Sequence, residues 1–232
     1  TIDATDITAI AINGNNSSRI FNVSDISATV QMHNLTMING QVTGSEEGGA
    51  ILNIGDLALY RCTFFQNSSA EAGGAISSKG GSLSLLECIV DDNDAGFNWG
   101  GGIYVEGGSL TIGQSTISRN TASFGGGIFI DGLQAGPFTI ANSTISSNTV
   151  DNEGGGIEMA DGTLSIINTT IANNYAPFSG GMYIENNATV NLTNTLVANN
   201  TSDGDGPNID NFGTINSLGN SLIADTTGTR YT

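Results

Sequence analysis

Ionisable side chains that could act as acids, bases or nucleophiles are few and scattered in this sequence. The chain has one histidine, His33, and five Lys and Arg residues. His33, Arg61 and Glu87 hold similar places in three successive segments, and their spacing predicts one mixed ionisable column. This column fits either an exposed ladder of ion pairs, which stabilises little, or part of a glycan site. Because a lone histidine lacks the orienting partner that catalysis needs, we interpret His33 as a strand-edge residue.

The adjacent carboxylates Asp91 and Asp92 raise the alternative of a polysaccharide lyase or glycoside hydrolase. A glycosidase holds two carboxylates on either side of the scissile bond. The pair lacks the His-Gly and Arg-x-Lys companions of polygalacturonase-like hydrolases, so a solvated strand end is the favoured interpretation. An enzyme acting on an extracellular glycan therefore stays as the alternative function, with Asp91, Asp92 and Arg61 as the residues to test.

Aromatic residues concentrate in short segments of variable length, where acidic residues also gather. Loops that vary on a rigid scaffold commonly carry binding residues, and aromatic rings beside carboxylates suit sugars or a protein partner. The alternative is that the rings fold back over the corners of the structure. A second group, Tyr104 and Phe129, is expected to form an exposed apolar patch. The candidate binding residues are Phe97, Trp99, Tyr104, Phe124, Phe129, Tyr175 and Phe178.

Carboxylates near the C-terminal end could hold a calcium ion. Asp203, Asp205 and Asp210 are the best candidates, since Ca²⁺ takes several oxygen ligands in loose geometry. They lack a defined calcium-loop signature. We therefore expect that no cofactor is required and that Ca²⁺ is an optional ligand.

These residues are positioned by an internal repeat with two landmarks. The first landmark is a glycine pair before an apolar residue. The second landmark is an apolar residue followed three places later by Asn. The asparagine of this landmark recurs every 26 to 28 residues, from Asn39 through six later asparagines. Stacked amides can hydrogen-bond along an axis, so we expect a structural ladder of Asn67, Asn93, Asn120, Asn148, Asn174 and Asn200. The glycine pairs stand at Gly48-Gly49, Gly73-Gly74, Gly100-Gly101, Gly125-Gly126, Gly154-Gly155 and Gly180-Gly181.

The two cysteines follow the same period. Cys62 and Cys88 each stand five residues before a ladder asparagine, so they occupy one column in consecutive units. Strand spacing would allow a disulfide, and a stack of buried free thiols fits equally well. Neither cysteine has a partner at the spacing that zinc binding or nucleophilic catalysis needs.

Within each unit apolar and polar residues alternate with period two, as in Leu83-Ser84-Leu85 and Leu110-Thr111-Ile112. No helical pattern occurs. The sequence predicts an all-β parallel β-helix of about eight coils, with three short strands in each coil. We expect a single domain over residues 1–232, made of an atypical N-terminal coil (1–29), regular coils (30–214) and a partial last coil (215–232).

The paired motifs Gly73-Gly74-Ala75-Ile76 and Phe64-Phe65-Gln66-Asn67 resemble the repeats of the chlamydial polymorphic outer membrane proteins, which are adhesin passengers. The segment from Gly213 to Ile223 resembles the terminal coil of bacterial secreted right-handed β-helix proteins. The resemblance implies a right-handed coil, secretion and a place on the cell surface. It implies no particular activity.

Composition narrows the function further. The formal net charge of -17 disfavours nucleic acid as a partner, and no apolar run is long enough to span a membrane. We predict an extracellular structural or adhesive surface protein whose edge loops bind a glycan, a cell-surface protein or a second copy of the chain, head to tail and in filaments. A weaker alternative is ice binding by a column of Thr116, Thr144 and Thr170, which Phe64 and Ile89 would interrupt.

Overall fold

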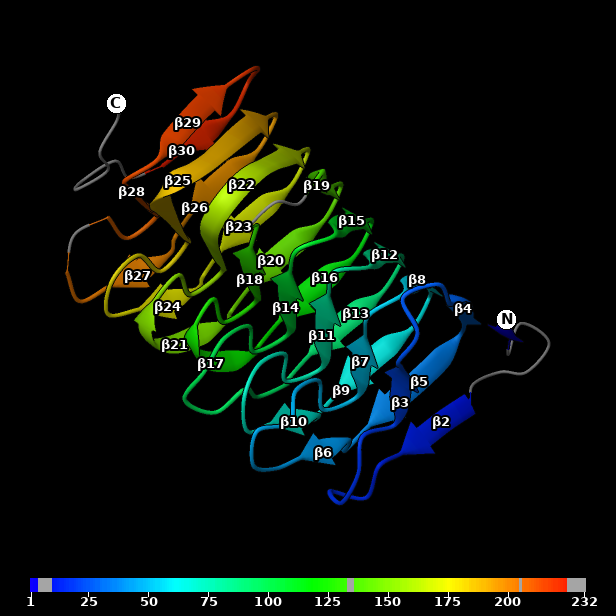
Figure 1. The fold of residues 1–232 in the computed structure, drawn as a ribbon. Helices are drawn as coiled ribbons and strands as arrows, with labels where there is room; N and C mark the ends of the chain where they lie inside the picture. The colour runs from blue at the N-terminus through cyan, green and yellow to red at the C-terminus, as the bar shows by residue number, and fades with distance from the viewer. Residues whose placement is uncertain (4–9, 133–135, 205, 225–232) are drawn as a thin grey trace.

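The computed structural model describes residues 1–3, 10–132, 136–204 and 206–224, and it forms a parallel β-helix. Figure 1 shows the coils stacked from the N-terminal end to the C-terminal end, with each strand beside the equivalent strand of the next coil. No helix occurs in the described ranges. The predicted all-β class and the stacking of about eight coils are therefore confirmed.

Three sheet faces form the sides of each coil. The first face contains β1 (Ile2–Asp3), β4 (Thr29–His33), β8 (Asp56–Tyr60), β12 (Ser82–Leu86), β15 (Ser109–Gly113), β19 (Phe138–Ala141), the later parts of β22 (Ile157–Ile167) and β25 (Met182–Thr193), and β29 (Thr214–Ser217). The second face contains β2 (Ile10–Asn13), β5 (Leu35–Ile38), β9 (Thr63–Phe65), β13 (Ile89–Asp91), β16 (Thr116–Ser118), β20 (Thr144–Ser146), β23 (Thr170–Ala172), β26 (Leu196–Ala198) and β30 (Leu222–Ile223).

The third face follows the glycine pairs. It contains β3 (Phe21–Val23), β7 (Ile51–Asn53), β11 (Ile76–Lys79), β14 (Ile103–Glu106), β18 (Ile128–Asp131), the first parts of β22 and β25, and β28 (Ile209–Asn211). The three predicted strands of each coil are thus present. A short fourth strand, which the sequence did not predict, follows most ladder asparagines: β6 (Gln41–Val42), β10 (Ser68–Ser69), β17 (Thr121–Phe124), β21 (Thr149–Glu153), β24 (Tyr175–Ala176) and β27 (Thr201–Ser202).

The core is one column of apolar side chains inside the coils. Period-two alternation turns every second residue inward. The strand register then places each inward residue beside a similar residue of the next coil. Ile76 pairs with Ile103, which pairs with Ile128, and all three are fully buried. One contiguous buried cluster runs from Met32 to Ile209. Burial of this column supplies most of the driving force for folding.

The asparagine ladder is present and buried. Asn120 shows its geometry: Nδ2 donates to Asn148 Oδ1 at 3.0 Å and to the Val90 carbonyl oxygen at 3.0 Å. The Asn120 backbone N–H also donates to Asn148 Oδ1, at 2.9 Å. The same pattern links Asn67, Asn93, Asn120, Asn148, Asn174 and Asn200.

The two ends of the ladder depart from the predicted pattern of one asparagine in each repeat. The backbone N–H of Gly40, not the side chain of Asn39, donates to Asn67 Oδ1. Asn39 stands one position earlier and its amide bonds to Asn13. At the other end Asn200 Nδ2 donates to Asn208 Oδ1 at 2.9 Å, although Asn208 follows only eight residues later and so lies outside the repeat spacing.

The cysteine column is also confirmed, and both thiols are free and buried. Interaction with the Cys62 side chain and burial raise the pKa of Cys88. Hydroxyl groups continue the column: the Cys88 N–H donates to Ser115 Oγ, and the Ser115 N–H donates to Ser143 Oγ. These thiols therefore take part in packing.

Glycine pairs are required where the chain enters the third face. Gly73 has φ of +67°, which L side chains rarely adopt. A Cβ on Gly74 would lie 2.2 Å from the Gly101 carbonyl oxygen of the next coil. The first glycine of the pair thus sets the turn and the second permits close stacking.

Candidate functional site

The segments between the ladder and the third face form a continuous flank of loops, which we name the loop flank. It comprises residues 41–50, 68–75, 94–102, 121–127, 149–156, 175–181, 201–204 and 206–208. Figure 1 shows the short strands β6, β10, β17, β21, β24 and β27 along this flank. Register therefore brings together aromatic and acidic residues that are far apart in sequence.

One predicted surface patch is wrong. Tyr104 and Phe129 are neighbours in register, as expected, but they are only 8% and 7% exposed. The indole of Trp99 folds back from the loop flank, with ring centroids 6.4 Å from Tyr104 and 6.3 Å from Phe129. Phe124 packs against the same cluster. These four rings cover the third face. This arrangement agrees with the alternative given in the sequence analysis, in which aromatic rings of the loops fold back over the structure.

The other candidate aromatic residues lie at the surface of the loop flank. Phe97 is 85% exposed and Phe178 is 53% exposed. Tyr175 donates a hydrogen bond of 2.8 Å from its hydroxyl to Asp203 Oδ2. The structure thus divides the candidate set into a covering cluster around Trp99 and three separate rings, Phe97 beside that cluster and Tyr175 and Phe178 in the C-terminal coils.

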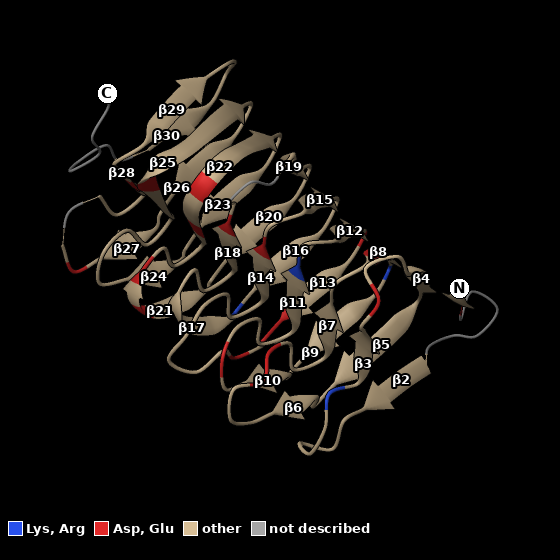
Figure 2. Cartoon of the chain, in the orientation of Figure 1, with Lys and Arg blue, Asp and Glu red and all other residues tan. Residues whose placement is uncertain are grey.

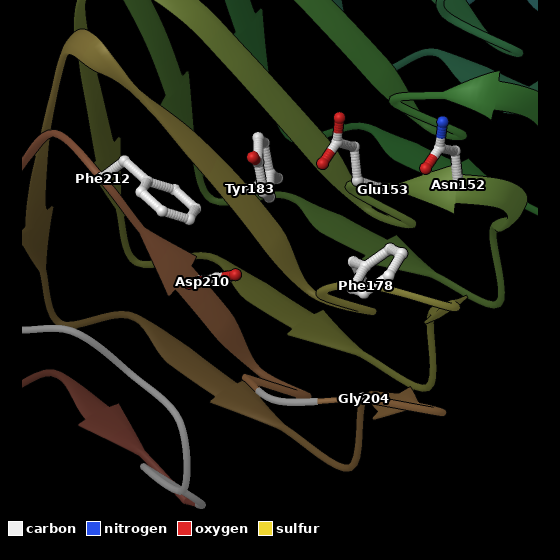
Figure 3. Close-up of a pocket in the computed structure, with 7 residues that line it drawn as sticks. All are labelled: Asn152, Glu153, Phe178, Tyr183, Gly204, Asp210 and Phe212. Carbon is white, nitrogen blue, oxygen red and sulfur yellow. The ribbon is translucent and has the colours of Figure 1, made fainter.

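A hollow of about 490 Å³ lies at the C-terminal end of the loop flank. Figure 3 shows its lining: Asn152 and Glu153 from β21, Phe178, Tyr183 from β25, Gly204, Asp210 from β28, and Phe212. The rings of Tyr183 and Phe212 are 5.6 Å apart between centroids. Aromatic walls beside carboxylates are typical of binding sites for polar ligands with apolar parts.

Carboxylates around this hollow are shielded from water and repel one another. Burial and the charges of Glu185 and Asp210 raise the pKa of Glu153, against a hydrogen bond with Tyr183. Burial raises the pKa of Glu185, with the charges of Asp131 and Asp161 adding to the effect. The hollow is therefore surrounded by carboxyl groups that hold their protons more readily than free carboxyls do, and a nearby cation would favour their ionised form.

Glu158 lies in register between Phe129 and Tyr183, next to the hollow. It is 2% exposed, and its Oε2 atom has no hydrogen-bond partner among the described residues. Burial, followed by the charges of Glu153 and Glu185, raises its pKa well above the ordinary value. Its outward-facing position in the repeat is visible in the sequence, whereas its burial by the loop flank is not.

Among the described residues, Lys, Arg and His occur only up to Arg119, and Arg230 lies outside the described residues. No Lys, Arg or His occurs in residues 120–229. Figure 2 shows basic segments only up to β17, whereas acidic segments continue along the later coils. Within residues 120–224, the hollow is therefore surrounded by acidic residues and by no basic residue.

The predicted calcium ligands are not brought together in the described residues. Asp203 bonds to Tyr175, Asp210 lines the hollow, and Asp205 lies outside the described residues. In the part of the chain that the structure describes, no group of three His, Cys, Asp or Glu side chains has the geometry to hold a metal ion. The calcium site stays a prediction.

The ionisable column near the N-terminal end is one residue out of the expected register. His33 pairs with Tyr60, and their rings stack at 4.7 Å, so Asn34 and not His33 is equivalent to Arg61. A hollow of about 370 Å³ still contacts His33, Arg61 and Glu87. Arg61 Nε donates to Glu87 Oε2 at 2.7 Å, which makes the pair an exposed ion pair.

Neighbouring side chains donate hydrogen bonds to the two carboxylates that were the candidates for a hydrolase site. Asp91 accepts hydrogen bonds from Ser118 and Arg119, and Asp92 accepts one from Gln66. Arg61 is bonded to Glu87 and is not part of this group. The arrangement holds a corner of the coil together.

The threonine column of Thr116, Thr144 and Thr170 on the second face has the expected register, and only Phe64 is out of place. Thr116 pairs with Thr144 and Ile89, and Ile89 pairs with Thr63, while Phe64 points into the core. Ile89 thus interrupts the column, as expected, and Phe64 does not.

Of the residues that line the hollow, only Phe178 and Asp210 were candidate site residues from the sequence. Asp210, not Phe212, is in register with Tyr183, so the repeat spacing does not identify Phe212. The described residues include no helix long and apolar enough to cross a bilayer.

Comparison with known families agrees with this architecture. The family model of the right handed beta helix region matches residues 101–229, which is more than half of the chain. The model of the Chlamydia polymorphic membrane protein repeat matches residues 61–79, which include both motifs quoted above. Comparisons with curated proteins and with solved structures give no significant match. The expected handedness and the expected repeat are thus confirmed, and the chain belongs to the right-handed β-helix family, with a repeat of the chlamydial polymorphic membrane protein type.

Proposed function

We propose that this chain is the rigid, surface-exposed part of an extracellular protein and that it binds partners through its loop flank. One observation carries the proposal: aromatic and carboxylate side chains gather on loops of unequal length, above coils that a buried amide ladder holds in register. Variable loops on a rigid scaffold are where binding residues commonly occur. The repeat shared with chlamydial polymorphic membrane proteins supports a location at the cell surface.

Two features of the flank suit adhesion. Phe97 and Phe178 expose large rings that no neighbouring side chain covers fully, and exposed apolar surface of this kind favours partner contact. The C-terminal hollow adds aromatic walls and carboxylates within one concave site. Glycans and cell-surface proteins are the proposed partner classes, with Ca²⁺ as a proposed optional ligand.

A retention screen tests this proposal. Purified protein is applied to immobilised acidic and neutral polysaccharides, with and without calcium, and the eluates are assayed for new reducing or unsaturated ends. We expect retention without cleavage, and we expect Phe178→Ser to weaken it. Ile89→Ser is the matched control, since Ile89 is 46% exposed on the second face.

Two results would contradict the proposal. Cleavage of any polysaccharide would favour the alternative of a lyase or hydrolase. Equal loss of retention in Phe178→Ser and Ile89→Ser would show that the loop flank has no special part in binding.

A further inference from the structure

We propose that the hollow at the C-terminal end of the loop flank binds the protonated amine of a lysine side chain on a partner protein. This inference rests on the proposed function, because it names the chemistry by which the loop flank would hold its partner. The hollow is bounded by Glu153, Tyr183, Asp210, Phe178 and Phe212.

The first argument is charge. Glu153 and Asp210 line the hollow, and Glu158 and Glu185 lie close enough to raise the pKa values of their neighbours. No Lys, Arg or His occurs in residues 120–224, and Arg230 lies outside the described residues. A bound cation would relieve this repulsion, because an opposite charge stabilises the ionised form of each carboxylate.

The second argument is the aromatic walls. Phe178, Tyr183 and Phe212 present three rings, and the last two are 5.6 Å apart between centroids. Ring faces attract an ammonium group when the group lies within about 6 Å of the ring centroid. The same rings provide apolar surface for a methylene stem, which a lysine side chain has and a metal ion lacks.

The third argument is exposure and size. Phe178 is 53% exposed, so the hollow opens to solvent at the surface of the flank. A volume of about 490 Å³ is large enough for one long side chain and part of its backbone. A side chain presented by a protein surface can therefore enter the hollow without rearrangement of the coils.

The test is a calorimetric titration of the whole protein with Nα-acetyl-lysine N-methylamide. The neutral comparison compound is Nα-acetyl-norleucine N-methylamide, which keeps the stem and lacks the amine. We expect measurable binding of the lysine compound that weakens with added salt, and roughly tenfold weaker binding of the norleucine compound. Glucosamine and calcium chloride are titrated separately as competing ligands.

Variants locate the binding. Glu153→Gln should weaken binding of the lysine compound roughly fivefold or more, and Phe178→Ala should weaken it about threefold to tenfold. Asp151→Asn is the matched control, because Asp151 is on the same strand, is exposed and does not line the hollow. It should change binding less than about twofold. Thermal melts check that each variant stays folded.

Several outcomes would overturn the proposal. They are equal binding of the lysine and norleucine compounds, no binding of either, an equal effect of Glu153→Gln and Asp151→Asn, and tighter binding of glucosamine or calcium than of the lysine compound. Failure here would leave retention on polysaccharides through the loop flank untouched. Loss of that retention would instead refute the proposed function.

Discussion

The N-terminal coils and the C-terminal coils share one scaffold and differ in their surface charge. Up to residue 119, carboxylates of successive coils are bridged by bases: Arg19 with Glu46, Arg61 with Glu87, Lys79 with Glu47 and Glu106, and Arg119 with Asp91. From residue 120 to residue 224 the chain has no base to form such bridges. The core column and the asparagine ladder nevertheless continue unchanged through both halves.

This difference separates what holds the fold from what the surface does. Because the C-terminal coils stack equally well without ion pairs, the ladder and the core are sufficient to set the register. Exposed ion pairs contribute little in any case. A buried carboxylate such as Glu158 destabilises the folded state when it is ionised, so stability does not explain the acidic surface of the C-terminal coils.

The largest expected effect comes from breaking the ladder, which should matter equally in the two halves. Asn148→Ala removes hydrogen bonds to the Ile117 carbonyl and Asn174 Oδ1, and the Asn120 backbone N–H and side-chain amide lose Asn148 Oδ1 as their acceptor. We expect each of Asn93→Ala and Asn148→Ala to lower the free energy of unfolding by about 3–5 kcal/mol, measured by urea denaturation. Asn168→Gly, in an exposed amide pair, is the control. A large loss in only one half would contradict the shared scaffold.

The next effect tests the close stacking at the glycine pairs. Gly74→Ala and Gly155→Ala would each place a Cβ within 2.5 Å of a carbonyl oxygen of the adjacent coil. We expect each to lower the free energy of unfolding by about 2–4 kcal/mol. Gly113→Ala is the control, since its nearest contact is a Leu86 methyl group at 3.2 Å and its φ is not positive. Similar melting temperatures for Gly74→Ala and Gly113→Ala would contradict the steric account.

A smaller effect should be confined to the C-terminal half and should depend on pH. The pKa of Glu158 is raised in the folded state above its ordinary value of 4.5, so the folded protein holds this proton to higher pH than the unfolded chain does. Its favourable contribution is therefore present below the unfolded pKa and is lost as pH rises through the folded pKa. We expect the melting temperature to fall as pH rises above the ordinary glutamate pKa of 4.5.

Glu158→Gln sharpens this prediction. The substitution removes the buried titratable carboxyl, and we expect it to raise the free energy of unfolding by about 1–3 kcal/mol at pH values where Glu158 is ionised and to flatten the pH dependence. Glu87→Gln, on the N-terminal side, is the control for a carboxylate that is exposed. An unchanged pH profile in Glu158→Gln would mean that other groups cause the slope.

The smallest effect is expected for the exposed ion pairs of the N-terminal half. Glu87→Gln removes the contact between Arg61 Nε and Glu87 Oε2. Because both side chains are largely solvated, we expect no measurable change in melting temperature at physiological salt. A clear loss of stability would mean that ion pairs, and not the ladder alone, hold the N-terminal coils in register.

The repeat made the scaffold predictable from sequence. Period-two alternation, paired glycines and the asparagine spacing each reflect a contact with the adjacent coil, and these contacts recur in the structure. Register was less predictable at Asn39 and His33, where a shift of one residue changes the face of the strand that a side chain occupies. The sequence did not predict Asn208 as a ladder residue, because the step from Asn200 to Asn208 is much shorter than one repeat.

The candidate site was less predictable because it depends on how loops fold. Trp99 and Phe178 are similar in the sequence, since each is an aromatic residue just before a glycine pair. The structure turns Trp99 onto Tyr104 and Phe129, whereas Phe178 lines an open hollow. Loop length and the neighbouring coil decide between these outcomes, and neither is encoded in the local pattern. Phe212 joins the hollow only through stacking of the last coils.

The central claim is that binding is a property of the acidic loop flank of the C-terminal coils. The most direct measurement compares two double variants for retention on the immobilised polysaccharide panel and on immobilised polylysine. Glu153→Gln with Phe178→Ala alters the C-terminal hollow, and Glu87→Gln with Tyr60→Ala alters the N-terminal one. We predict that the first pair abolishes most of the retention and that the second leaves it intact. Equal retention of the two double variants would contradict the account. Loss of retention only in Glu87→Gln with Tyr60→Ala would contradict it as well.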